Sequence, residues 1–124
     1  MNVLLDSHCL LWWLADMALS DAASDIISDP SNNVFVSAAS IWELEIKAAL
    51  GKLVVDADLI TEVPEAGFSW LPITAQHGRA AAQLPRHHRD PFDRMLIAQA
   101  QVEQCSLISR DSKFDSYAVA LIKA

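Results

Sequence analysis

The sequence is poor in cysteine, glycine and proline. Its 124 residues include two cysteines, three glycines and five prolines. Two cysteines, Cys9 and Cys105, are too few for a disulfide framework, and we expect both to be buried free thiols. With 52% hydrophobic residues and so little glycine and proline, extensive disorder is excluded. We therefore expect one compact domain over residues 1–124.

Long apolar runs and an excess of basic residues are also absent. No apolar run reaches the roughly 18 residues that a membrane span needs, and the N-terminus lacks a signal-peptide pattern. We expect a cytoplasmic protein that does not contact membranes. The net charge of −7 argues against generic binding to a phosphate backbone, which depends on Lys and Arg. An acidic site filled by divalent cations is the exception, because the ions reverse the local charge.

What the sequence does have is an alternation of apolar runs with amphipathic stretches. Leu10, Trp13, Leu14 and Met17 form one helical stripe, whereas "NVLL" at the N-terminus is typical of a buried parallel strand. The predicted strands lie at residues 2–5, 34–37, 68–73 and 105–109. The predicted helices lie at residues 7–16, 19–30, 40–53, 56–66, 74–84 and 90–100. This alternation predicts the α/β class, with a parallel sheet between two helical layers.

Four acidic residues fall where the predicted strands lead into helices. Asp6 ends the first strand, Glu43 lies in the helix after the second, Asp93 opens the helix before the last strand, and Asp111 follows that strand. Ligands of parallel α/β sheets bind at the carboxyl ends of the strands, so these side chains can converge. Several carboxylates suit Mg²⁺ or Mn²⁺, and no zinc-type Cys or His spacing is present. Two such ions can activate water for phosphodiester hydrolysis.

Each of these acids also has a purely structural interpretation. Asp6 is a suitable N-cap, and Ser40 with Glu43 matches the S-x-x-E capping box. Residues 90–93, "DPFD", form a complete helix-start signal, with an N-cap and a proline at the first helical position. Asp111 can cap the final turn. Taken singly each acid is explained as a cap, but an acid at every such edge is less expected.

At this point the ordered motifs identify a family. "NVLLDSHCLLWWLAD", "VFVSAASIWELEIKAALGKL", "DPFDRMLIAQAQ" and "LISRDSKFDSY" together resemble the PIN-domain family, in particular the VapC-type toxins of bacterial toxin–antitoxin pairs. The resemblance implies a PIN-like three-layer α/β/α sandwich with a central parallel sheet. It implies a Mg²⁺- or Mn²⁺-dependent endoribonuclease that cleaves RNA. It also implies a VapB-like antitoxin whose C-terminal segment blocks the site, and a homodimer.

The resemblance also assigns roles residue by residue. Asp6, Glu43, Asp93 and Asp111 match the family's catalytic, metal-ligating acids, while Asp90 has no family counterpart and remains the N-cap of its helix. Family members differ in which acids touch metal directly, and the last acid often acts through water. We predict substrate contacts for five further residues, each of which also has an ordinary structural alternative: a turn, a solvated loop or an ion pair. These residues are Ser7, Arg86, Arg89, Arg94 and Arg110.

The two adjacent tryptophans cannot share one core pocket. Trp12 and Trp13 point in different directions on a helix, so we expect one to pack inside and the other to contact the antitoxin, with core packing as the alternative. A different class of function remains open for the whole chain: a non-catalytic PIN-fold module that binds a peptide partner, with the acids serving as caps. Under that alternative, Asp93→Asn is nearly neutral, because Asn caps well.

Overall fold

Strands and helices alternate along the chain, as the sequence predicts. The computed structural model describes residues 1–56, 58–87 and 89–124. The strands are β1 (Asn2–Leu5), β2 (Asn33–Ser37), β3 (Ser69–Leu71), β4 (Ser106–Ser109) and β5 (Leu121–Lys123). The α-helices are α1 (Ser7–Leu14), α2 (Asp21–Ser28), α3 (Ala38–Ala49), α4 (Leu59–Glu65), α5 (Ala75–Gln83) and α6 (Pro91–Glu103), and η1 (Ser112–Ser116) is a 3₁₀ helix.

The five strands form one parallel sheet in the order β3-β2-β1-β4-β5. In register, Leu4 of β1 lies between Phe35 of β2 and Leu107 of β4. The chain builds outward from β1 to β3 and then returns to the other side of β1 with β4. The strand order therefore reverses between β1 and β4, and the carboxyl ends of these two strands flank the place where such sheets bind ligands.

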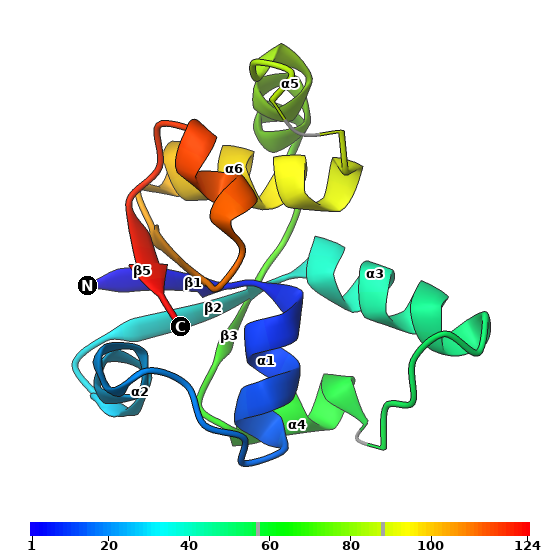
Figure 1. Ribbon diagram of the computed structural model, residues 1–124, viewed down its shortest axis with the longest axis vertical. Helices are drawn as coiled ribbons and strands as arrows, with labels where there is room; N and C mark the ends of the chain where they lie inside the picture. Colours follow the sequence, from blue (N-terminus) through cyan, green and yellow to red (C-terminus); the bar gives the residue numbers. More distant parts are fainter. Residues whose placement is uncertain (57, 88) are drawn as a thin grey trace.

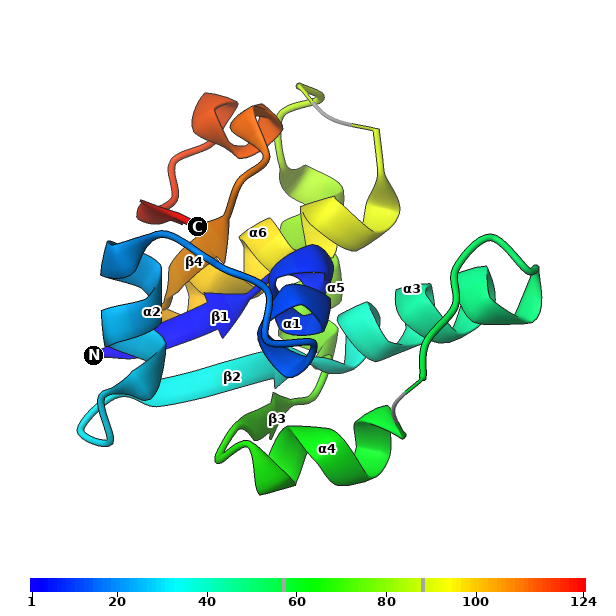
Figure 2. The ribbon, with the colours of Figure 1, turned by 60° about the horizontal axis from the view of Figure 1, so that its bottom comes forward.

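Helices cover both faces of the sheet, which confirms the predicted three-layer sandwich. In Figure 1, α5 and α6 lie above the sheet and α1, α2 and α4 lie below it. Each face has its own buried apolar cluster: Val3 and Leu5 of β1 belong to one, and Leu4 belongs to the other. This alternation follows from the two-residue period of a strand. Figure 2 shows α3 extending away from the sheet beyond the end of β2.

Four helices begin where the sequence predicts, including α1, which has Asp6 as its N-cap. Ser20 accepts a hydrogen bond from the Ala23 N–H at the start of α2, and Asp90 accepts from Phe92 N–H at the start of α6. At the start of α5, Thr74 caps the helix and the side chain at its third position, His77, completes a capping box. These N-caps satisfy backbone donors that have no partner within the helix.

Two predicted details of the N-terminal half are wrong. Helix α3 begins at Ala38 with Ser37 as its N-cap, so Ser40 and Glu43 do not form a capping box. Strand β2 passes directly into α3, and the serine at the end of the strand takes the capping position. Helix α1 ends at Leu14, and Met17 lies beyond it, exposed, outside the predicted stripe.

The helix predicted at residues 56–66 is shorter in the structure, and residues 121–123 form a strand that the sequence does not predict. Asp58 caps α4, which runs from Leu59 to Glu65 rather than from residue 56; Ala57 lies outside the described residues. The tail after the final turn pairs with β4 as the strand β5. Its backbone hydrogen bonds cover the edge of β4, a pairing that the short segment "LIK" does not reveal in the sequence.

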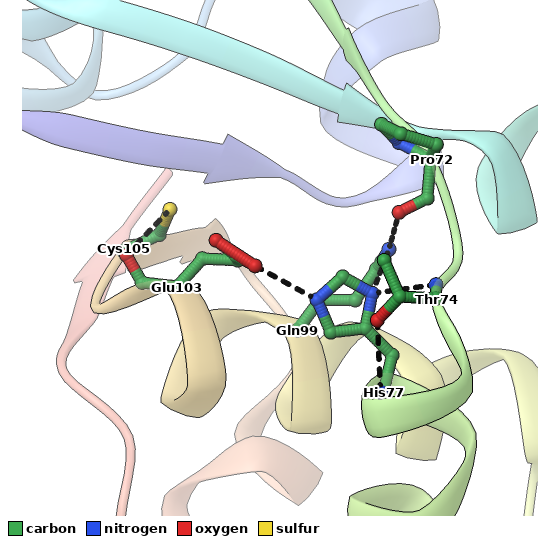
Figure 3. A network of polar contacts seen from close by, with 6 residues as sticks. All are labelled: Pro72, Thr74, His77, Gln99, Glu103 and Cys105. Carbon is green, nitrogen blue, oxygen red and sulfur yellow. Dashed lines mark hydrogen bonds and ion pairs between the residues drawn. The ribbon is translucent and has the colours of Figure 1, made fainter.

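A buried polar network joins α5 to α6 (Figure 3). His77 is 1% exposed, and its Nδ1 accepts a hydrogen bond from the Thr74 N–H at 3.1 Å. Its Nε2 lies 3.1 Å from Oε1 of Glu103, and Gln99 Nε2 donates to the carbonyl of Pro72 at 3.3 Å. Because the Thr74 N–H can only donate, the ring proton resides on Nε2. The network fixes the packing of the two helices.

Both cysteines are free and buried, as the sequence predicts. Desolvation by burial, and then the neighbouring Asp6 carboxylate, raise the pKa of the Cys9 thiol. Burial also raises the pKa of the Cys105 thiol. Within the described ranges, no helix has the length and apolarity needed to cross a membrane.

Candidate active site

Acidic side chains from distant parts of the sequence meet at one pocket of about 190 Å³. The pocket lies where the strand order reverses, beyond the ends of β1 and β4. The four acids predicted from the sequence all contribute to it, together with Asp90. Its lining is Asp6, Ser7, His8, Glu43, Lys47, Asp90, Asp93, Asp111, Lys113 and Phe114. The predicted convergence of the four carboxylates is thus observed.

Asp6 is held by two hydrogen bonds at the end of β1. Its Oδ1 accepts from the Cys9 N–H at 2.8 Å, which makes it the N-cap of α1. Its Oδ2 accepts from the hydroxyl of Ser109, the last residue of β4. The same hydroxyl oxygen accepts from the Asp111 N–H at 3.0 Å. Ser109, which is fully buried, therefore connects the acids that follow the two central strands.

Glu43 is likewise fixed by neighbours on two helices. The Ser7 hydroxyl of α1 donates to Oε1 of Glu43 at 2.8 Å, and Lys47, one turn later in α3, pairs with Oε2 at 3.0 Å. Glu43 is only 5% exposed, so both oxygens need these partners to offset the loss of hydration. The hydroxyl of Ser7 thus holds the Glu43 carboxylate, just as the hydroxyl of Ser109 holds that of Asp6.

The start of α6 places two more acids at the pocket, and they differ in local role. Asp90 is the N-cap, and its Oδ1 accepts from the N–H groups of Phe92 at 2.8 Å and of Asp93 at 3.3 Å. Asp93 belongs to the first turn of the helix, where a negative charge is favourable. Asp111 lines the pocket and is also an N-cap. Its Oδ1 accepts a hydrogen bond from the Lys113 N–H at 2.9 Å, at the start of η1.

The donor chemistry of the pocket suits a hard divalent cation. Five carboxylates supply oxygen atoms only, which Mg²⁺ and Mn²⁺ prefer. In the part of the chain that the structure describes, however, no three acidic, histidine or cysteine side chains form a ready-made ion site. Several oxygens are instead engaged by Ser7, Ser109 and Lys47. The residues present fit a metal in type and location, and binding one requires local side-chain adjustment.

The arginines predicted to contact substrate lie outside this pocket. Arg86, Arg89 and Arg94 line a separate open groove of about 820 Å³ on the other side of the α6 N-terminus. The guanidinium of Arg94 donates to the carbonyls of Ala81, Leu84 and Pro85 at 2.8 to 3.0 Å, so it also closes the end of α5. His88, in the same basic segment, lies outside the described residues.

The side chain of Arg110 makes structural contacts within the chain. It donates to the backbone carbonyls of Ala18 at 2.6 Å and Ala124 at 2.9 Å, and its guanidinium carbon lies 4.4 Å above the ring of Trp12. Trp12 and Trp13 are both half-buried, and Trp13 lies against Phe68 with ring centroids 6.5 Å apart. Both tryptophans pack partly buried against the same core cluster, and contact with the antitoxin stays a prediction.

Sequence reasoning missed several residues that line the pocket or hold its acids, among them Ser109, Lys47 and Asp90. Ser109 links Asp6 and Asp111, and no local sequence signal indicates this link. Lys47 was not considered, although its spacing of four residues from Glu43 on a helix favours an ion pair. Asp90 was assigned only to capping, whereas its side chain also lines the pocket.

Fold and pocket together define the class: a parallel α/β/α sandwich with an acidic site where the strand order reverses. The chain belongs to the PIN domain family, whose family model matches residues 3–120. It is 31% identical over 128 residues to ribonuclease VapC22 of Mycobacterium tuberculosis (strain ATCC 25618 / H37Rv), in an alignment that covers 94% of this chain and 92% of that protein.

Solved structures agree with this fold. A VapBC2 complex from Rickettsia felis, bound to a DNA fragment from its promoter, superposes with a TM-score of 0.76 at 12% identity, covering 100% of this chain and 99% of that one. DNA-bound VapBC from Salmonella typhimurium gives 0.74 at 14% identity, with 99% and 98% covered. FitAcB from Neisseria gonorrhoeae gives 0.67 at 21% identity, with 98% and 96% covered.

Proposed function

We propose that this protein is a metal-dependent endoribonuclease that acts as the toxin of a toxin–antitoxin pair in the cytoplasm. The observation that carries the proposal is the gathering of five carboxylates at the switch point of a PIN-family sheet. The relative at 31% identity is named a ribonuclease, which supports RNA as the substrate. Structural neighbours include toxin–antitoxin complexes, which supports a VapB-like antitoxin segment as the partner. A homodimer is proposed from the family resemblance.

In this proposal Asp6, Glu43, Asp93 and Asp111 hold Mg²⁺ or Mn²⁺. The ion, when bound, supplies an activated water and charge stabilisation for phosphodiester hydrolysis. The chain itself supplies the positioning: Ser109 orients Asp6, and Ser7 orients Glu43.

Charged residues around the pocket and groove complete the proposed arrangement. Lys47 and Lys113 offset part of the negative charge before the ion arrives. The groove is lined by three arginines, Arg86, Arg89 and Arg94. Their side chains are suited to contact phosphates of the RNA that flank the pocket.

The test is cleavage of total cellular RNA by purified, antitoxin-free protein with Mg²⁺ or Mn²⁺, with chelator, and with Asp93→Asn. We expect cleavage to require both the ion and Asp93. Asp25→Asn, a change of an exposed acid on α2, is the matched control and should cleave normally.

Thermal stability separates this proposal from a non-catalytic module. An ion at one hundred times its dissociation constant stabilises the folded state by about 2.7 kcal/mol. We expect that stabilisation in the wild type and Asp25→Asn, but not in Asp93→Asn. A folded wild type that neither cleaves RNA nor gains stability with either ion contradicts the proposal and favours the peptide-binding module, in which the acids are caps.

A further inference from the structure

An exposed tryptophan stands beside the acidic pocket. Trp42 of α3 is 62% exposed, although indole is among the most costly side chains to leave in water. It contacts Phe92 of α6 edge-on, with ring centroids 5.2 Å apart and planes at 75°. This geometry is a favourable one for an aromatic pair. The contact restrains the indole while leaving most of its surface open.

The sequence neighbours of both rings are acids of the pocket. Glu43 follows Trp42, and Asp93 follows Phe92; both acids line the pocket, and α3 and α6 are in contact there. Other apolar side chains are equally exposed, including Ile60 of α4 at 61%, but neither sequence neighbour of Ile60 lines the pocket. Location and restraint, rather than exposure alone, distinguish Trp42.

The first turn of α6 separates the acidic pocket from the arginine groove. Asp90 and Asp93 line the pocket, whereas Pro91 and Arg94 line the groove. Phe92, which contacts Trp42, lies between these positions in the sequence. A nucleotide chain has phosphates for an ion in the pocket and for the guanidinium groups of the groove. It also has bases for the aromatic pair, whose two rings each adjoin a pocket acid in the sequence. The phosphates and bases that repeat along a nucleotide chain match all three features at once.

We propose that Trp42, braced by Phe92, stacks on an unpaired nucleobase of the RNA next to the phosphate bound in the acidic pocket. The inference rests on the proposed ribonuclease function and assigns a base-contacting residue to it. Bases within a duplex are already stacked on each other, whereas unpaired bases are free to stack on an aromatic side chain. Stacking tolerates any base, so Trp42 selects for strand state more than for sequence.

The test measures oligonucleotide binding rather than RNA cleavage by the metal-bound enzyme. Fluorescence anisotropy of a short, cleavage-resistant 2′-O-methyl oligoadenylate with Mg²⁺ is compared in otherwise wild-type protein carrying Trp42, Trp42→Leu or Trp42→Phe. Leucine keeps an apolar side chain without a π face, whereas phenylalanine keeps the face. We expect Trp42→Leu to weaken binding by roughly fivefold to a hundredfold, the range for one base on one aromatic ring. Trp42→Phe should stay within about threefold of the parent.

Two controls assign the loss to the base. Ile60→Ala removes an equally exposed apolar side chain away from the pocket and should bind as the parent does. An abasic oligonucleotide of the same length should bind Trp42 and Trp42→Leu proteins equally. Because Trp42 is mostly exposed, its variants should keep the melting temperature of the parent within a few degrees.

The outcomes separate this inference from the proposed function. If Trp42→Leu binds oligoadenylate as tightly as the parent, or loses the same factor with the abasic strand, the stacking role is overturned even when the wild type cleaves RNA. If Trp42→Leu changes only the oligomeric state or the binding of a protein partner, the stacking role is likewise overturned. If binding depends on Trp42 and the base while the wild type cleaves nothing, stacking stands and the nuclease proposal fails.

Discussion

Replacing Ser109 by alanine tests whether one buried hydroxyl organises the acidic pocket. That hydroxyl donates to the Asp6 carboxylate and accepts from the Asp111 N–H at 3.0 Å. A hydrogen bond to a charged group contributes about 1.5–3 kcal/mol, and Asp6 is only 6% exposed, so water replaces the lost donor poorly. We expect Ser109→Ala to lower the free energy of unfolding by about 2–3 kcal/mol.

The stability loss is measurable in two ways. For a chain of this length it corresponds to a fall in melting temperature of about 8–12 °C. Urea unfolding should give a lower midpoint with an unchanged slope, because the folded structure is otherwise preserved. Ser28→Ala, at an exposed serine that ends α2, should change stability by less than about 0.5 kcal/mol.

The same variant has a functional readout. Groups that orient metal ligands change metal affinity or activity by about 10- to 100-fold when removed. We therefore expect Ser109→Ala to need more Mg²⁺ or Mn²⁺ for thermal stabilisation and to cleave RNA more slowly at equal metal. A variant that is as stable as wild type and binds metal equally well would refute the reasoning that Ser109 positions Asp6.

Three further predictions follow from the fold. Asp90→Ala removes the acceptor for two backbone N–H groups of α6 and should cost about 1 kcal/mol in urea unfolding, whereas Asp90→Asn keeps the cap and should cost little. His77→Ala opens a cavity and leaves buried polar groups unpaired, so it should lower stability by about 3 kcal/mol. Because burial and then Asp6 raise the pKa of Cys9 in the folded state, the unfolded thiol ionises first; stability should fall as pH rises above about 9, less steeply in Cys9→Ala.

Each of these has an opposing result. Equal losses for Asp90→Ala and Asp90→Asn would show that the charge, and not the cap, is what α6 requires. Stability of His77→Ala within 1 kcal/mol of wild type would show that water satisfies the network. Parallel pH profiles for wild type and Cys9→Ala between about pH 8 and 10 would show that Cys9 does not contribute to the alkaline loss.

Local signals in the sequence determined much of the fold and part of the site. The α/β class follows from the alternation of apolar runs and amphipathic stretches, and the starts of α2 and α6 follow from Ser20 and the "DPFD" segment. These signals act over three or four residues, so the sequence contains them completely. The acids Asp6, Glu43 and Asp93 were recognisable for the same reason, as acids at predicted strand-to-helix edges.

Tertiary structure alone decided the strand order, the pairing of β5 and the identity of the residues that hold the acids. Ser109 meets Asp6 across 103 positions of sequence, and Ser7 meets Glu43 across 36. The tertiary structure also brings Arg110 into contact with backbone carbonyls and with Trp12. It brings Trp42 into contact with Phe92 beside the pocket. Such contacts depend on which strands become neighbours in the sheet. That choice reflects the packing of the whole core, which no short segment encodes.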